Sequence, residues 1–372
     1  MSEYQYYEFQ AVDRALNSAE QGEVAKLSSR VDISPHRAVF TYDFGDFRGN
    51  PVKLLSKYFD AMLYVASWGS RWLYFRMPAS LVRLQDLKPY CAEDLIKIST
   101  SEHHIIVGIE FDEEGGSGWL QPEGELDELL PVRQRLLEGD YRALYLAWLK
   151  ANEYAEDAAD EGLEPPVPPG LRTLSPPLKA FADFFEINDD LLIVAAESSA
   201  EIPSETDLDG FVSELSPEEQ QDFLRRFTRG ESDAAGRLRL RLTEIARQER
   251  PGLLSKPSEP RRRVSELLER TAAREHERAE RDRQAREAAR LRQLESLAKE
   301  EPQLWHQVDS LFAQKQTKAY DQAVEILKQL KDLAQHRQQL DPFLDRIRAI
   351  QQQYRTRPGL LARLQEAGLT LV

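Results

Sequence analysis

The charged residues of this chain are sorted along its length rather than spread evenly. Residues 102–164 contain 17 acidic side chains and four basic ones, so this stretch holds 13 of the 15 net negative charges. Residues 261–300 contain 12 basic and nine acidic side chains and almost no aromatic ones. Because a core needs apolar and aromatic side chains, this contrast predicts an acidic compact domain followed by a charged helical arm.

Length and net charge set the first limits on domain number and on partners. At 372 residues the chain is long enough for two or three domains, because single cores rarely grow beyond about 250–300 residues. Apolar residues make up 41% of the chain, with 15 Phe, and the N-terminal half is the part able to bury a core. A net charge of −15 repels phosphate backbones, so nucleic acid is not the expected partner.

Cysteine content and hydropathy predict a cytoplasmic protein. The single cysteine, Cys91, excludes an intramolecular disulfide and a cysteine-based zinc cluster, which suits a reducing compartment. The opening residues, MSEYQYYEFQAVDR, lack the basic and apolar regions of a signal peptide. No run approaches the roughly 18–20 apolar residues that a bilayer crossing needs. We therefore expect no membrane contact.

Residues 1–202 are predicted to form an acidic α+β domain, a mixed sheet with helices. Roughly alternating apolar residues predict strands at residues 6–12, 37–47, 71–77 and 104–111. Apolar residues at helical spacing predict helices at residues 18–29, 51–66, 129–137, 141–154 and 178–185. The apolar run LLIVAA at 191–196 predicts a buried strand, and Gly115, Gly116 and Gly118 a flexible turn. Six prolines between residues 164 and 177 predict a surface loop of this domain.

The rest of the chain is predicted to be all-α: a helical connector domain at 203–256, a long charged helical arm at 257–300 and a small helical bundle at 301–372. Pro203 marks the change. Ser216 and Glu219 form a capping box around Pro217, which predicts a helix start. The bundle has apolar residues at helical spacing in four places, at residues 305–312, 320–330, 343–354 and 360–364.

The arm is predicted to be one helix from Val264 to Glu300. Several acidic side chains precede a basic one by four residues, the favourable order on a helix. Between Ala273 and Ala285 the only other apolar residue is Ala279, too little to bury a coiled-coil seam. A solvated single helix is therefore favoured, and a coiled coil remains open.

Four carboxylates are the candidate catalytic residues if the protein is an enzyme: Asp43, Asp46, Glu110 and Asp112. They lie at or beside the ends of predicted strands, as the carboxylates of a magnesium-dependent nuclease do. Such a site usually includes a lysine, and EFDEEGG offers none nearby. The alternative is that these acids cap turns and keep strand edges soluble. The histidine spacing offers no metal site and no phosphate-binding loop is present, so no metal and no cofactor is predicted.

A candidate ligand-binding patch interleaves basic and aromatic side chains: Arg71, Trp72, Tyr74 and Arg76, with Arg83 nearby. Stacking and charge together can hold a nucleotide or a phosphate. A strand with aromatic residues on its inner face and arginines on its outer face has the same sequence pattern, and this structural alternative is the favoured one.

Candidate partner-binding residues lie at the start of the arm and in the bundle. Arg261, Arg262 and Arg263 form a basic cluster that can contact an acidic surface, including this protein's own region 102–164. Trp305, Phe312 and Tyr320 are the aromatic candidates in the bundle, because so few small helices are expected to bury little apolar surface without a partner.

Three parts of the sequence resemble a family of uncharacterised bacterial proteins. They are the opening YQYYEFQAVDR, then GDFRGNP with KYFDAMLYVASWGSRWLYFRMP, and the close YDQAVEILKQL with RPGLLARLQEAGL. The resemblance runs nearly end to end, and the family is loosely associated with neighbours that encode SWIM zinc-finger proteins. It implies a bacterial cytoplasmic setting and adds no mechanism.

The sequence favours a non-enzymatic intracellular binding or scaffold protein that contacts another protein through its C-terminal helices. One alternative is an enzyme or nucleotide-binding module in the N-terminal domain that uses the four carboxylates. Another is a nucleic-acid-associated accessory protein that uses Arg261–Arg263 and the arm. The oligomeric state is left open.

Overall fold

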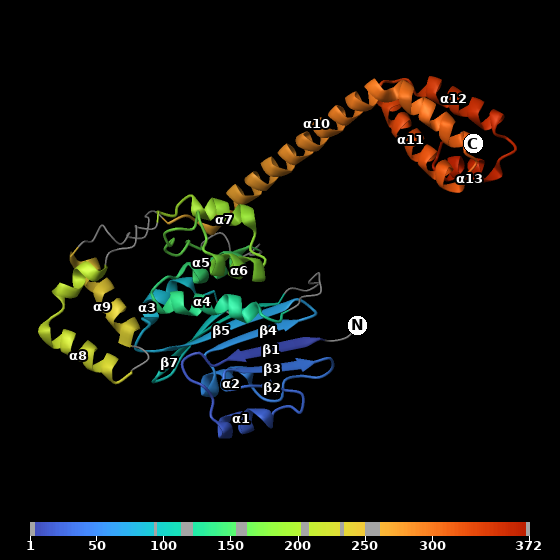
Figure 1. Ribbon diagram of the computed structural model, residues 1–372. Helices are drawn as coiled ribbons and strands as arrows, with labels where there is room; N and C mark the ends of the chain where they lie inside the picture. Colours follow the sequence, from blue (N-terminus) through green and yellow to red (C-terminus); the bar gives the residue numbers. More distant parts are fainter. Residues whose placement is uncertain are drawn as a thin grey trace. The chain divides into compact units, whose positions relative to one another are not determined.

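A seven-stranded antiparallel sheet organises the N-terminal part of the chain (Figure 1). The computed structural model describes residues 4–92, 95–112, 122–153, 162–201, 208–230, 234–249 and 261–369. The strand order is β2-β3-β1-β4-β5-β7-β6. The strands are β1 Gln5–Gln10, β2 Asp32–Ile33, β3 Arg37–Tyr42, β4 Ala61–Ala66, β5 Ser70–Pro78, β6 Ile96–Thr100 and β7 His104–Asp112. The predicted α+β fold is confirmed, with antiparallel pairing between all these strands where a mixed sheet was expected.

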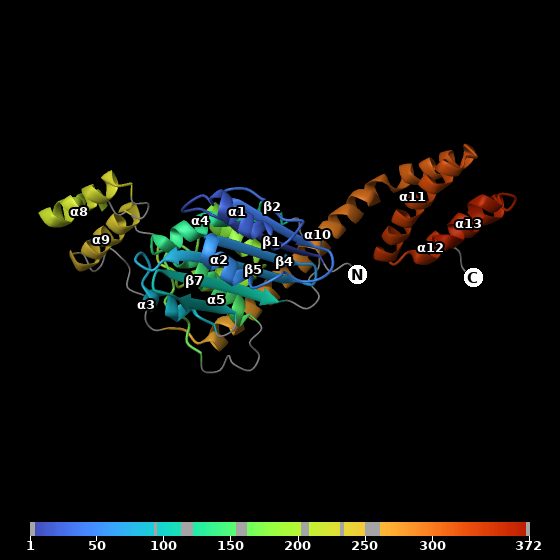
Figure 2. The same ribbon diagram turned by 90° about the horizontal axis from the view of Figure 1, so that it is seen from below.

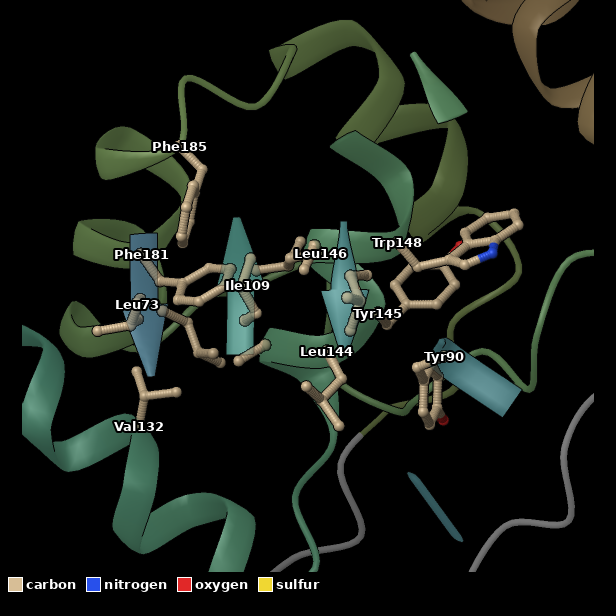
Figure 3. Close-up of a cluster of buried hydrophobic side chains, with 14 of the residues drawn as sticks. Leu73, Tyr90, Ile109, Val132, Leu144, Tyr145, Leu146, Trp148, Phe181 and Phe185 are labelled. Carbon is tan, nitrogen blue, oxygen red and sulfur yellow. The ribbon is translucent and has the colours of Figure 1, made fainter. Parts of the chain in front are cut away.

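Helices cover both faces of the sheet (Figure 1). On one face lie α4 Glu125–Leu137, α5 Arg142–Asn152, α6 Pro176–Phe184 and α7 Asp189–Ala196. Their core includes Leu73, Ile109, Val132, Tyr145 and Phe181, which Figure 3 shows meeting between the strands and the helices. On the other face, α1 Ser18–Ala25 and α2 Pro51–Tyr58 pack over Phe9, Phe40 and Met62. Burial on two faces explains why the central strands are apolar almost throughout.

The helix predicted to run from residue 51 to residue 66 is wrong in its second half. Helix α2 ends at Tyr58, and Phe59 already has extended backbone angles. Ala61–Ala66 is instead strand β4, which pairs with β1 on one side and β5 on the other. All six of its residues are buried. A strand covered on both faces has no apolar–polar alternation, so its sequence pattern resembles that of a buried helix.

The buried strand predicted at residues 191–196 is also wrong, because this segment is helix α7. The side chain of Asn188 caps the helix by accepting hydrogen bonds from the backbone N–H groups of Asp190 and Leu191. Only part of the run is buried, and Ile193 is exposed. The sequence Asn188-Asp189-Asp190 is the helix-start signal that the apolar run concealed. Pro203 and the turn expected at Gly115, Gly116 and Gly118 lie outside the described residues.

Gly108 in β7 lies directly opposite Tyr74 in β5. An added Cβ at Gly108 would lie 2.3 Å from Cε1 of the Tyr74 ring, far inside van der Waals contact. The Tyr74 side chain is buried, and its hydroxyl donates a hydrogen bond to Glu110. Glycine is therefore required here by the close approach of an anchored ring.

Gly108→Ala is expected to lower the free energy of unfolding by about 1–3 kcal/mol, because the Tyr74 ring must leave its place in the core. Urea denaturation of the full chain measures this. Gly22→Ala in α1 is the matched control, since a Cβ there meets nothing within 4 Å. It is expected to stabilise slightly. Equal unfolding midpoints for the two variants would contradict the close approach.

Five further helical elements lie between residues 84 and 249 in the described part of the chain: α3 Leu84–Leu87, η1 Lys88–Tyr90, η2 Leu208–Glu214, α8 Pro217–Thr228 and α9 Ala234–Glu249. The predicted capping box is confirmed, since Ser216 Oγ accepts from the Glu219 N–H at 3.2 Å and Glu219 Oε2 accepts from the Ser216 N–H at 2.9 Å. Helix α8 has no buried residue and exposes Leu224 and Phe227.

Helix α10 runs without interruption from Val264 to Ala313. The two helices predicted around residues 264–300 and 305–312 are therefore one, and Pro302 lies inside it. A proline inside a helix removes one backbone hydrogen bond, but its φ angle is compatible with a helix. The helix can therefore continue where the packing of nearby side chains compensates for the lost bond. Here Trp305, Val308 and Phe312 are buried just beyond Pro302. The ten residues Arg281–Arg290 are all exposed in the chain.

The chain divides into two compact units, Met1–Arg274 and Glu275–Val372. In the second unit, α11 Thr317–His336, α12 Leu340–Gln353 and α13 Pro358–Glu366 pack with the end of α10. The helical C-terminal half that the sequence predicted is confirmed. The finer division at residues 202, 256 and 300 stays a prediction. Among the helices of the described part of the chain, none combines the length and hydropathy of a membrane span. Figure 2 shows the same elements from below.

Candidate binding surface at one end of the sheet

A row of aromatic side chains crosses three neighbouring strands on the α1–α2 face of the sheet. Tyr7 in β1, Tyr64 in β4 and Trp72 in β5 occupy directly paired positions. The ring centroids lie 4.4 Å apart for Tyr7 and Tyr64 and 4.3 Å apart for Tyr64 and Trp72. Tyr7 and Tyr64 are buried, and Trp72 is half-buried at the end of the row. Directly opposed aromatic pairs of this kind stabilise a sheet and hold its rings in place.

A buried glutamine connects this row to the loop that follows β3. The hydroxyls of Tyr7 and Tyr64 donate to Gln5 Oε1 at 3.1 and 3.3 Å. Gln5 Nε2 donates to the Gly45 carbonyl at 3.0 Å and to Asp46 Oδ1 at 3.3 Å. Burial, with the negative charge of Asp46 adding to it, raises the pKa of Tyr7 to about 12. Burial also raises the pKa of Tyr64, with Tyr7 and the charges of Asp112 and Asp46 adding to the effect.

The same loop exposes an aromatic ring. Phe47 is buried with its ring centroid 5.0 Å from those of Tyr7 and Phe40, which anchors the loop in the core. Phe44, three residues earlier, is 77% exposed. Its neighbours in sequence are Asp43 and Gly45, and Asp46 follows. The anchored loop therefore holds a large apolar ring in solvent between two carboxylates.

A second exposed ring lies at the same end of the sheet, in the turn between β4 and β5. Trp68 is 42% exposed, and its Nε1–H donates to Ser70 Oγ at 2.9 Å. Hydrogen bonds between Tyr4 and Ser67 hold this turn beside the start of β1, on the side opposite β3. Because Tyr42 and Ala66 flank Gln5 in the sheet, the two loops are separated by about two strand spacings, roughly 10 Å.

Asp112 completes this end of the sheet. It lies opposite Ser70, and its Oδ1 accepts a hydrogen bond from Trp72 Nε1 at 3.2 Å. With the residues that the structure describes, Asp43, Asp46 and Asp112 form no ion pair. We call the six residues Phe44, Trp68, Trp72, Asp43, Asp46 and Asp112 the sheet-end surface.

The four candidate catalytic carboxylates are only partly brought together. Asp43, Asp46 and Asp112 belong to the sheet-end surface, but Glu110 accepts hydrogen bonds from Tyr74 Oη and from Lys97 Nζ, the latter at 2.9 Å. Burial, with the charge of Asp112, raises the pKa of Glu110. Within the described residues, no three histidine, cysteine or carboxylate side chains are arranged to hold a metal ion.

The candidate patch Arg71, Trp72, Tyr74 and Arg76 is divided between the two faces of β5. Arg71 is buried among the α4–α7 layer, where it forms an ion pair with Glu186. On the other face, Trp72 and Tyr74 lie over the sheet, and Arg76 forms an ion pair with the buried Asp60 at 2.6 Å. Strand geometry sends neighbouring side chains to opposite faces, so the four residues do not form one patch.

The basic cluster at the start of the arm is partly buried inside the first unit. Arg262 makes a bidentate ion pair with Glu164, with Nη2–Oε1 and Nε–Oε2 distances of 2.7 and 2.8 Å. It also donates to the carbonyls of Val194 and Ala195 at the end of α7. The predicted contact between this cluster and region 102–164 is therefore confirmed for Arg262, and burial removes that side chain from any partner. Arg261 and Arg263 are exposed.

The aromatic candidates in the bundle belong largely to its own core. Trp305 and Phe312 are buried, and the guanidinium of Arg346 lies 3.9 Å from the centre of the Trp305 ring. Tyr320 is half-buried, with its hydroxyl 3.4 Å from Nη1 of Arg357. The bundle buries a 15-residue core within the chain, so the expectation of little buried surface is wrong.

A groove lies on the helical layer of the first unit. It has a volume of about 760 Å³ and lies between α6, α7 and the preceding segment. Leu174, Leu192 and Ile193 contribute apolar walls, and charges of both signs line the rim. Cys91 is exposed.

Sequence reasoning missed Phe44, Trp68 and Gln5. The available signal was a large aromatic residue directly before a glycine, at Phe44-Gly45 and at Trp68-Gly69, because polar residues are more usual in turns. Comparisons with family models, curated proteins and solved structures find no match to this chain. The resemblance to uncharacterised bacterial proteins stays a prediction.

Proposed function

We propose that this chain is a non-enzymatic intracellular binding protein that contacts another protein through the sheet-end surface. The observation that carries the proposal is the exposure of Phe44 and Trp68 on anchored loops beside three carboxylates without ion pairs. Aromatic residues are enriched at the centres of protein interfaces, and a fixed ring loses little conformational entropy on binding.

Burial in the second unit supports this location over the C-terminal helices. Trp305 and Phe312 already fill the bundle core. Among the described residues, the exposed large hydrophobic side chains all lie at or before Phe227 in the sequence. The enzymatic alternative needs the carboxylates to converge on one substrate, and Glu110 is instead engaged by Tyr74 and Lys97.

Affinity capture with the full-length chain as bait tests the proposal. Phe44→Ser/Trp68→Ser is expected to lose a partner protein that the wild-type chain enriches from a cell lysate. Leu224→Ser/Phe227→Ser is the matched control, because it removes two other exposed apolar side chains, both on α8. This variant is expected to keep the partner. Equal retention by both variants would place the contact elsewhere. Circular dichroism verifies that each variant is folded.

A further inference from the structure

We infer that the segment recognised by the sheet-end surface is cationic and carries arginine. The inference rests on the proposed function and names the chemistry of the partner. It follows from the juxtaposition of exposed indole and phenyl rings with carboxylates that no described cation neutralises. An exposed apolar patch on its own admits many partners, whereas this arrangement of charge and rings selects among them.

Charge is the first part of the argument. Asp43 and Asp46 flank Phe44 in sequence, and Asp112 accepts from Trp72 at 3.2 Å. Burial raises the pKa of Tyr4, and the negative charges of Glu123 and Asp43 raise it further. Arg48 is the one basic residue of the loop after β3. Burial raises the pKa of Tyr42, and Arg48 opposes this increase. The local balance is negative, so an incoming cation gains attraction and an anion is repelled.

The fixed indoles are the second part. The Nε1–H groups of Trp68 and Trp72 are already bound to Ser70 Oγ and Asp112 Oδ1. Both rings are therefore held in place with their hydrogen-bonding edge satisfied, and what they offer a partner is ring surface. Tryptophan is the strongest aromatic partner for a cation lying over its face. A cation at this end of the sheet meets a ring and a carboxylate together.

Arginine fits both elements better than lysine does. Its planar guanidinium stacks on an aromatic face while its N–H groups bond a carboxylate, and it is less strongly hydrated than an ammonium group. Lysine offers a compact charge with a higher desolvation cost. The surface is therefore expected to bind an arginine peptide more tightly than a lysine peptide. The net negative charge of the protein alone would attract the two peptides equally.

Peptide binding to the full-length chain tests this inference. The probes are fluorescein-labelled peptides of four Arg-Gly, four Lys-Gly or four Glu-Gly repeats. Fluorescence anisotropy measures the binding of each peptide. The arginine peptide is expected to bind several-fold more tightly than the lysine peptide and the glutamate peptide not at all. Asp43→Asn/Asp46→Asn/Asp112→Asn is expected to weaken arginine-peptide binding about tenfold, the sum of three modest surface charge interactions.

The matched control removes the same number of charges from exposed aspartates of the second unit, with Asp282→Asn/Asp309→Asn/Asp332→Asn. It is expected to leave binding unchanged. Equal weakening in the two triple variants, or equal affinity for arginine and lysine peptides, overturns the inference. If the peptide experiment fails but capture of the partner still depends on Phe44 and Trp68, only the inference about arginine is overturned. If capture does not depend on these two residues, the proposed function itself is overturned. Loss of self-association in the Asp43→Asn/Asp46→Asn/Asp112→Asn variant would identify the charged arm of a second copy as the occupant and would overturn the assignment of this surface to a different protein.

Discussion

Arg262→Met is expected to destabilise the N-terminal unit by about 3–5 kcal/mol, because it leaves the carboxylate of Glu164 buried without its counter-ion. Glu164 is 1% exposed and Arg262 8%. The remaining partner of the carboxylate is the hydroxyl of Tyr145. The substitution also removes the guanidinium hydrogen bonds to the carbonyls of Val194 and Ala195, which keep only their backbone N–H donors at the end of α7. Hydrogen–deuterium exchange of the β1 and β4 amides reports the opening of this unit separately from the bundle.

Two further variants identify the cause of that loss. Glu164→Gln/Arg262→Met removes the stranded charge and is expected to recover much of the stability, since a neutral pair has no buried ion to desolvate. Arg270→Met breaks the exposed ion pair with Glu197 instead. It is expected to cost less than about 1 kcal/mol. Equal protection factors for Arg262→Met and Arg270→Met would show that the buried pair contributes little.

Asp60→Asn has the second-largest expected effect, about 3 kcal/mol, because it removes the counter-ion of Arg76 and a nearby charge for Arg133. Asp60 is buried; its Oδ2 accepts the backbone N–H groups of Val12 and Asp13 at 2.7 and 2.9 Å. Arg133 in turn binds the Arg76 carbonyl and Asp13. The carboxylate thus joins the start of β4 to the end of β1 and to α4.

The pH dependence of Asp60 has a definite sign. Burial opposes ionisation, but hydrogen bonds from Asp13 and Arg76 outweigh it and hold the pKa of Asp60 below its usual 3.8. The carboxylate therefore stabilises the fold fully above that value, and the contribution is lost as pH falls through the lower, folded pKa. Urea denaturation at several pH values measures this. The difference between wild type and Asp60→Asn is expected to shrink below about pH 4; a constant difference down to pH 2.5 would contradict it.

The sequence predicted the elements whose pattern matches their final environment. Strands β5 and β7 and helices α4, α5 and α8 were placed correctly, because a clear turn or cap signal bounds each of them, such as Pro78 at the end of β5 or the Ser216–Glu219 capping box at the start of α8. Strand β4 and helix α7 were assigned wrongly because burial erased the period of the strand and an apolar run hid the Asn188 cap. Local sequence does not reveal how many sides of a segment will be covered.

The candidate site was predicted in part. Asp46, Asp112 and Trp72 were chosen from sequence and do lie at one end of the sheet. Their association depends on strand order, since β3, β1, β4, β5 and β7 must be neighbours before the loops after them can meet. Strand order is set by packing among distant segments. The same limit explains Arg71 and Arg76, whose partners Glu186 and Asp60 could not be paired by spacing.

The return of the chain at Arg262 has a consequence for synthesis on the ribosome. The seven strands are complete at Asp112, yet Val264 and Leu267 belong to the core that covers them. The counter-ion of Glu164, Arg262, is synthesised 98 residues later in the chain. At about 5–20 residues per second, a finished sheet waits roughly 10–30 s for the segment that closes its core. During that interval the nascent protein is a substrate for chaperones, and a ribosome stalled before codon 262 leaves a complete sheet with an unfinished core.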